Sequence, residues 1–157
     1  MEYILIALAA CFLDQLVKFL VASNFDWNDS ITLIPGLLSI TKRANTGMAL
    51  SMLEGKTLFL GIVSAVVSVV LIVIILRWKL PKWERLSIAC VLGGALGNMI
   101  DRLFFGYVVD MIDVRIFTFN VADAFITCGA AAFVILYLIR SIKEEKEGKS
   151  GDKNGEN

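Results

Sequence analysis

Four aspartates follow one another closely in a part of the chain that is otherwise mostly apolar: Asp101, Asp110, Asp113 and Asp123. Asp110 and Asp123 are the best candidates for chemistry, because the short connection between them can fold one carboxyl group back onto the other. Two carboxyl groups held close together cannot both ionise easily and tend to share one proton. One can then act as a base toward water while the other donates to a substrate carbonyl. The pair therefore allows hydrolysis of a peptide bond.

Each aspartate also has a simpler interpretation. Asp123 begins an apolar run, and an acid at the start of a helix caps free N–H groups and favours the helix dipole. Asp110 is then a solvated charge, Asp113 an ordinary turn residue, and Asp101 a marker of the membrane interface. Local sequence leaves both interpretations open.

Composition excludes several other kinds of site. The chain has no histidine, which removes Ser-His-Asp and Cys-His systems and zinc sites of the HExxH kind. The three cysteines lie far apart in apolar runs, which favours small buried side chains over disulfides or metal ligands. Basic and acidic residues number 15 each, so nothing indicates a nucleic-acid surface. We expect no metal and no organic cofactor.

The elements that position the aspartates are predicted to span a membrane. Of the 157 residues, 57% are hydrophobic, above the share of about 45–50% in soluble domains. A membrane-spanning helix needs about 20 mostly apolar residues. We therefore expect an all-α membrane protein, with one domain at 1–141 and a flexible polar tail at 142–157. Its helices are predicted at about 3–23, 57–77, 85–105 and 121–140.

Positive charges predict the orientation of these helices, because lysine and arginine gather on the cytoplasmic side of membrane proteins. The connection 77–85 holds four of them and the segment from 140 onward holds five, whereas segments 24–56 and 106–120 together hold four. We expect both termini in the cytoplasm and the aspartate pair at the outer surface. In the outer segment 24–56, Ile, Thr and Leu runs broken by proline and glycine predict short strands or an interfacial element.

Other polar residues lie within the predicted helices. Asp14 and Lys18 are four positions apart, so they share a helix face and can form an ion pair. Charges at this depth usually face the protein interior, where such a pair can hold the helices together or also shape a site. Gly93 and Gly97 have the GxxxG spacing that permits close helix approach. Asn98 lies deeper than the end of its helix and needs a partner within the protein.

Five sequence blocks resemble those of the lipoprotein signal peptidases, the bacterial type II signal peptidases, and occur in the same order. They are "DQLVK" at 14–18, "NTGMALS" at 45–51, "GGALGNMIDR" at 93–102, "GYVVDMID" at 106–113 and "FNVADAF" at 119–125. Each block is short, but five in order on four predicted helices are specific. The resemblance covers about residues 10–140.

The resemblance implies a membrane aspartyl endopeptidase, which removes signal peptides from prolipoproteins by cutting before the diacylglyceryl-modified cysteine. It implies that Asp110 and Asp123 are the catalytic pair, in a site toward the outer leaflet of the bacterial cytoplasmic membrane. The implied partners are lipidated prolipoproteins and the lipid bilayer, and one chain suffices, so we expect a monomer. Further residues are implied to line or brace the site: Asp14, Lys18, Asn45, Asn98, Arg102 and Asn120.

The same residues allow two other functions. A small transporter or channel subunit would use Asp14, Lys18 and the outer acids as an ion path across the bilayer, but the polar residues gather toward the outer half. A non-catalytic membrane scaffold is the third hypothesis. The chain also departs from the family pattern, since Met48 and Leu50 replace small and aromatic residues and Phe117 lies where a proline often occurs.

Overall fold

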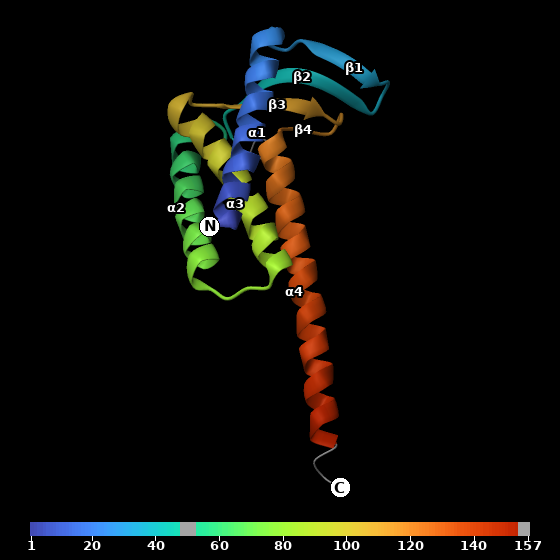
Figure 1. Cartoon of the computed structure of the whole chain (residues 1–157). Helices are drawn as coiled ribbons and strands as arrows, with labels where there is room; N and C mark the ends of the chain where they lie inside the picture. Colours follow the sequence, from blue (N-terminus) through green and yellow to red (C-terminus); the bar gives the residue numbers. More distant parts are fainter. Residues whose placement is uncertain (48–52, 154–157) are drawn as a thin grey trace.

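The computed structural model shows four long helices with a small sheet at one end (Figure 1). It describes residues 1–47 and 53–153, with side chains up to residue 147. Residues 48–52, which include the two departures at positions 48 and 50, and residues 154–157 of the predicted tail lie outside the described residues. The elements are α1 Glu2–Asn24, β1 Ser30–Ile34, β2 Leu38–Asn45, α2 Thr57–Arg77, α3 Lys82–Phe104, β3 Val108–Asp113, β4 Thr118–Phe119 and α4 Val121–Lys153.

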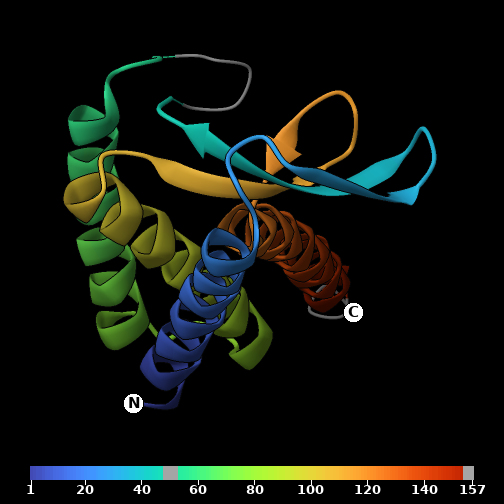
Figure 2. The same cartoon turned by 90° about the horizontal axis from the view of Figure 1, so that it is seen from above.

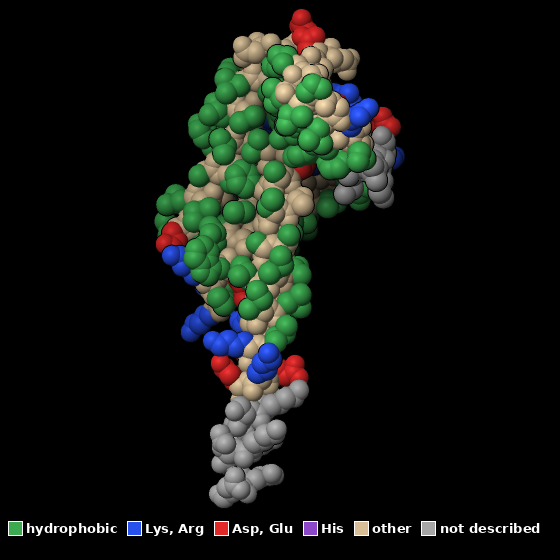
Figure 3. Space-filling view, turned by 90° about the vertical axis from the view of Figure 1, so that its right-hand side faces the viewer, with side chains coloured by type: hydrophobic (Ala, Val, Ile, Leu, Met, Phe, Trp, Pro, Cys, Tyr) green, Lys and Arg blue, Asp and Glu red, His purple; other side chains and the backbone are tan. Residues whose placement is uncertain are grey.

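The four predicted membrane helices are all present. Each is long and apolar enough to cross a membrane, which confirms the predicted fold class. α3 contacts each of the other three helices, and its span is the most buried of the four. Large apolar side chains cover the outer surfaces of α1, α2 and α4, and Figure 3 shows them along one side of the bundle. Such a continuous apolar surface fits contact with lipid.

Two helices differ in extent from the prediction. α3 begins at Lys82 rather than near 85, directly after Pro81, because proline is tolerated at a helix start but not inside a helix. α4 continues to Lys153 instead of ending near 140. The apolar run stops there, but the lysines and glutamates that follow are good helix formers, and Lys143 pairs with Glu147 at 3.8 Å. The tail predicted to be flexible is therefore helical as far as Lys153.

The sheet joins two outer segments that lie far apart in the sequence. β1 and β2 confirm the strands predicted within 24–56, and β3 and β4 extend them to an antiparallel sheet in the order β1-β2-β3-β4. The register places Arg43 opposite Asp110 and Asn45 opposite Val108. Figures 1 and 2 show the sheet at one end of the bundle, with its hairpin turns reaching beyond the helices. Asp110 therefore lies in a strand rather than in a solvated connection.

A lysine fastens this sheet to the bundle. Lys42 Nζ donates to the carbonyl oxygens of Ala22 and Phe25, both at 2.8 Å, and lies 4.6 Å from the centre of the Trp27 ring. The last carbonyl groups of a helix have no partner within the helix and carry partial negative charge. Lys42 satisfies them at the end of α1 and thereby fixes β2 beside that helix.

Glycines allow α3 to approach its neighbours closely. Gly93 and Gly97 face α1, as their GxxxG spacing predicts, and Gly94 faces the first turn of α4. A Cβ on Gly93 would lie 2.6 Å from a backbone oxygen of α1. A Cβ on Gly94 would overlap the Ala122 carbonyl oxygen, and one on Gly97 would overlap the Asp14 carboxylate. The start of α4 and the polar face of α1 can reach α3 only because these positions lack side chains.

Gly94→Ala should lower the free energy of unfolding by about 1–3 kcal/mol, measured by denaturation in detergent micelles. The added methyl group meets helix backbone, which cannot move aside by itself. Gly61→Ala is a matched control, because its Cβ would meet the flexible end of Leu103 at 2.7 Å and should cost less. An equal loss in the two variants would contradict the close backbone approach of α3 and α4.

Candidate active site

Asp110 lies in β3, with its carboxyl group buried and fully hydrogen-bonded. It is 1% exposed. Asn45 Nδ2 donates to one oxygen at 2.8 Å, and Asn120 Nδ2 donates to the other at 2.7 Å. Burial raises the pKa of Asp110 from 3.8 to about 6; the two amide groups oppose this rise, and the nearby charge of Asp123 adds to it. This carboxyl group therefore gains and loses its proton near pH 6.

Asp123 is held in the first turn of α4. Asn120 precedes the helix, and its Oδ1 accepts the Asp123 backbone N–H at 2.9 Å. Asp123 Oδ2 in turn accepts the Asn120 backbone N–H at 3.3 Å, which completes a capping box. Asn98 Nδ2 donates to the other Asp123 oxygen at 2.8 Å. Capping and chemistry are therefore not alternatives for Asp123, because the cap fixes the position of its carboxylate.

The connection between the two aspartates is a hairpin. β3 leads away from the bundle and β4 returns antiparallel to it, with Ile112 opposite Phe119. β4 ends directly before Asn120, whose side chain is 1% exposed and contacts both Asp110 and the backbone of Asp123. Thirteen positions of sequence thus bring the aspartates to opposite sides of one asparagine.

A buried ion cluster lies beside the pair. Lys18 Nζ is 2.8 Å from Asp14 and 2.7 Å from Asp101, and it donates to Asn98 Oδ1 at 3.1 Å, so two carboxylates and one amide oxygen surround its charge. Asp14 also accepts the Ala122 N–H at 2.8 Å, and so caps α4 from α1. The ion pair predicted between Asp14 and Lys18 is confirmed. Through Asn98, Lys18 is linked to Asp123 as well.

Arg102 and Asn45 hold the turn that follows β2. Arg102 Nη2 donates to the Gly47 carbonyl at 3.1 Å, and Asn45 Oδ1 accepts the Gly47 N–H at 2.9 Å. The Arg102 guanidinium lies close enough to both site aspartates to interact with their charges. Arg102 Nε is buried and has no hydrogen-bond partner among the described residues. The start of the "NTGMALS" block therefore borders the aspartate pair.

Sequence reasoning missed two members of this network. Asp101 was expected at the membrane interface, yet it is 3% exposed and pairs with Lys18. Gln15 Nε2 lies 2.9 Å from Asp101 Oδ1 and 3.2 Å from the Gly97 carbonyl oxygen. Both lie inside sequence blocks already noted, "DQLVK" and "GGALGNMIDR", so their place in those blocks was the available signal.

The structure brings all eight predicted site residues together at the junction of sheet and bundle. Asp113 stays apart from them at the end of β3, where it pairs with Arg43 at 3.2 Å. In the described part of the chain, no cluster of three or more His, Cys, Asp or Glu side chains is arranged to hold a metal ion. The chemistry on offer is that of two carboxyl groups, one of them with a pKa near neutrality.

Comparison with known proteins agrees with the resemblance of the five sequence blocks. Residues 6–139 match the family described as "Signal peptidase (SPase) II". Lipoprotein signal peptidases of Enterococcus faecalis and Staphylococcus aureus are 40% and 36% identical over 153 residues, covering 95% and 93% of this chain and 94% of each relative. That of Moorella thermoacetica is 42% identical over 133 residues, which are 82% of this chain and 87% of the relative. A solved structure described as a bacterial membrane enzyme is similar with a TM-score of 0.82 and 33% identity, over 89% of each chain.

Lys18→Met should lower the free energy of unfolding by about 3–5 kcal/mol, since it leaves buried carboxylates without their cation. Lys143→Met removes an ion pair of the same i,i+4 spacing whose side chains are 75% and 68% exposed, and should cost less than about 1 kcal/mol. Denaturation in mixed micelles measures both variants. If Lys18→Met were no more harmful than Lys143→Met, the ion cluster would not be what holds α1 to α3 and α4.

Proposed function

Since this chain belongs to the signal peptidase II family, we propose that Asp110 and Asp123 are the catalytic pair of an aspartyl endopeptidase that acts on prolipoproteins. Family membership makes the chain a peptidase, and its four spanning helices fit a bacterial inner-membrane protein. The observation that supports an aspartyl mechanism is the bridge through Asn120 between buried Asp110 and partly buried Asp123. Neither a histidine nor a clustered metal site competes for the role among the described residues.

The proposed reaction is attack of water on the scissile carbonyl group. One carboxylate takes a proton from the water while the other, protonated, carboxyl donates to the carbonyl oxygen. The tetrahedral intermediate then collapses, the C–N bond breaks, and a proton passes to the leaving nitrogen. The signal peptide gains a carboxylate and the lipidated cysteine an amino group. We assign neither aspartate as the base, because an interacting pair titrates as a unit.

The surrounding residues have supporting roles in this proposal. Asn45, Asn98 and Asn120 hold the carboxyl oxygens by their amide groups, so little reorganisation is needed when charge moves between them. The Arg102 guanidinium lies close enough to both aspartates to stabilise negative charge on the pair, and its Nη2 holds the turn at Gly47. Asp14 and Lys18 act indirectly, by fixing the first turn of α4 and the side chain of Asn98.

The charge distribution supports a site at the outer leaflet. Figure 1 shows the sheet at the end of the bundle opposite the α2–α3 connection, and α4 extends from that opposite end toward the C-terminus. This connection and the end of α4 carry most of the lysine and arginine residues. By the positive-inside rule both termini are then cytoplasmic. One chain supplies every residue of the network, so a monomer is sufficient for the reaction.

The apolar core argues against a transport path. Along α3, Ala89 and Leu92 of the apolar core lie between the ion cluster around Lys18 and Glu84, which pairs with Arg140 at 3.0 Å. A path for ions would need polar groups across this region. The apolar core therefore favours the peptidase hypothesis over the transporter hypothesis.

Asp110→Asn and Asp123→Asn should each reduce the cleavage rate of a lipidated prolipoprotein by at least about 10²–10⁴-fold, because proton transfer by the pair is lost. The rate is measured with purified protein in micelles, and the denaturation midpoint checks folding. Asp26→Asn is the control, since Asp26 is an exposed aspartate on the same side of the bundle. Cleavage by either folded site variant near the wild-type rate would exclude the proposed pair.

The pH profile offers a second test. Activity should fall as the pair loses its shared proton, when the pH rises through the pKa of Asp110, about 6. Asn45→Ala removes an amide group that stabilises the charged form, so the pKa of Asp110 rises and this limb of the kcat/KM profile moves to higher pH. Asn24→Ala, which removes an exposed amide at the end of α1, should leave the limb in place. A limb that stays fixed or moves to lower pH in Asn45→Ala would contradict the assignment.

A further inference from the structure

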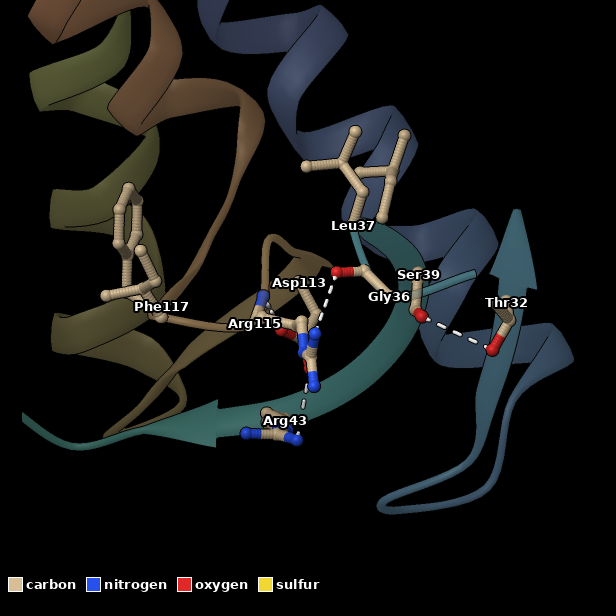
Figure 4. A pocket seen from close by; sticks show the side chains of 10 residues that line it. Thr32, Gly36, Leu37, Ser39, Arg43, Asp113, Arg115 and Phe117 are labelled. Atoms are coloured by element: carbon tan, nitrogen blue, oxygen red, sulfur yellow. Dashed lines mark hydrogen bonds and ion pairs between the residues drawn. The ribbon is translucent and has the colours of Figure 1, made fainter. Parts of the chain in front are cut away.

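A second polar site lies where the two hairpin turns of the sheet meet (Figure 4). It is a cavity of about 420 Å³. Its polar lining comes from all of the first three strands and the β3–β4 turn: Thr32, Ser39, Arg43, Asp113 and Arg115. Apolar side chains of the two turns, among them Leu37 and Phe117, border it. Of these five polar residues, only Asp113 lies in one of the sequence blocks, and none has a role in the catalytic proposal.

The cavity has an excess of positive charge. Arg43 Nη2 is 3.2 Å from Asp113 Oδ2, while Asp113 Oδ1 accepts the backbone N–H of Arg115 at 2.8 Å. Both oxygens of the single carboxylate are therefore occupied. The Arg115 guanidinium donates to the Gly36 carbonyl at 3.2 Å and pairs with no carboxylate in the described part of the chain. The Arg43 side chain is 54% exposed and Arg115 is also exposed, so both guanidinium groups retain N–H donors for a ligand.

Arg115 adopts a backbone conformation that rarely accommodates a large side chain. Its φ is 70°, in the left-handed region where glycine is favoured. From this position its side chain crosses to the other hairpin turn at Gly36, so the two turns form one wall of the cavity. A strained backbone at an accessible position indicates that position 115 is arginine because its side chain is needed there. The turn itself would favour glycine.

The cavity and the aspartate site are built on the same two strands, β2 and β3. Arg43 pairs with Asp110 beside a register shift in β2, and its exposed side chain reaches Asp113 while Asp110 stays buried. Asp113 lies three positions further along β3, at a distance of about 10 Å for an extended strand. Figure 1 shows that this direction leads away from the helices toward the hairpin turns. A chain leaving Asp110 along the sheet therefore passes the cavity.

We propose that this cavity binds an acidic side chain of the prolipoprotein, about three residues after the scissile bond. The inference rests on the proposed function, because it takes the cut to occur at Asp110 and Asp123. The apolar signal peptide occupies the bilayer, so the polar segment that follows the cut is the one that leaves along the sheet. Its carboxylate accepts charge-assisted hydrogen bonds from Arg43 and Arg115, while Leu37 and Phe117 contact its aliphatic stem.

The test compares three lipidated peptides that differ only at the third residue after the cut, which is Glu, Gln or Lys. Wild-type protein should cleave the Glu peptide with a kcat/KM about fivefold above that of the Gln peptide, and the Lys peptide should be the poorest. Arg43→Gln and Arg115→Gly should lose this preference and cleave the Gln peptide at the wild-type rate. Arg115→Gly also relieves the left-handed backbone, and an unchanged rate on the Gln peptide shows that the variant is folded. Lys79→Gln, an exposed cation at the far end of the bundle, should keep the preference.

Equal cleavage of the three peptides by wild-type protein would overturn the inference. So would arginine variants that lose activity equally on all three, above all if the loss occurred only in micelles that contain anionic lipid, since the cavity would then bind a lipid headgroup. These outcomes leave the catalytic proposal intact as long as Asp110→Asn and Asp123→Asn abolish cleavage of the Gln peptide. Retained cleavage in those two variants would defeat the catalytic proposal itself.

Discussion

A charged group buried in an apolar bundle needs a partner, and the structure around the site follows from this requirement. A buried ion that loses its partner costs several kcal/mol, so such groups persist only within complete networks. Oxygen atoms of three side chains from two helices surround the Lys18 ammonium group. One Asp14 oxygen also accepts a backbone N–H from the first turn of α4. The same contacts that neutralise the charges therefore fix α1, α3 and the start of α4 relative to one another. The aspartate pair lies at the point where these elements meet.

The asparagines extend this network from structure to chemistry. Asn98 connects Lys18 to Asp123, and Asn120 connects Asp123 to Asp110, so the two carboxyl groups are held from opposite sides. Neutral amide groups can orient a carboxylate without pairing it with a full positive charge. Asp110 therefore keeps a pKa near neutrality while its position is fixed. A cation in place of either amide group would lower the pKa of Asp110. The pair would then lose the shared proton that the proposed chemistry requires.

Sequence alone predicted the helices well, because membrane spans depend on composition over about 20 residues. The end of α4 was predicted too early. A hydropathy pattern marks the edge of the bilayer, whereas the helix continues beyond it for as long as its residues favour helix formation. β3 was missed, because a short apolar strand in a predicted connection has no distinct period of its own. Local sequence gave Asp110 and Asp123 as one of two interpretations, and the family resemblance selected them. Lys42, Gln15 and the cavity beside Arg115 depend on contacts between distant segments, which no local pattern records.

The proposed reaction requires that Asp110 and Asp123 share a single proton while the protein is active. Infrared difference spectroscopy can count protonated carboxyl groups by comparing wild-type protein with Asp110→Asn and Asp123→Asn at the pH of maximal cleavage. A shared proton should give one protonated carboxyl band in the wild type that is lost or shifted in both variants, because the proton belongs to the pair. Two ionised carboxylates at that pH, with the same spectrum in that region for all three proteins, would contradict it.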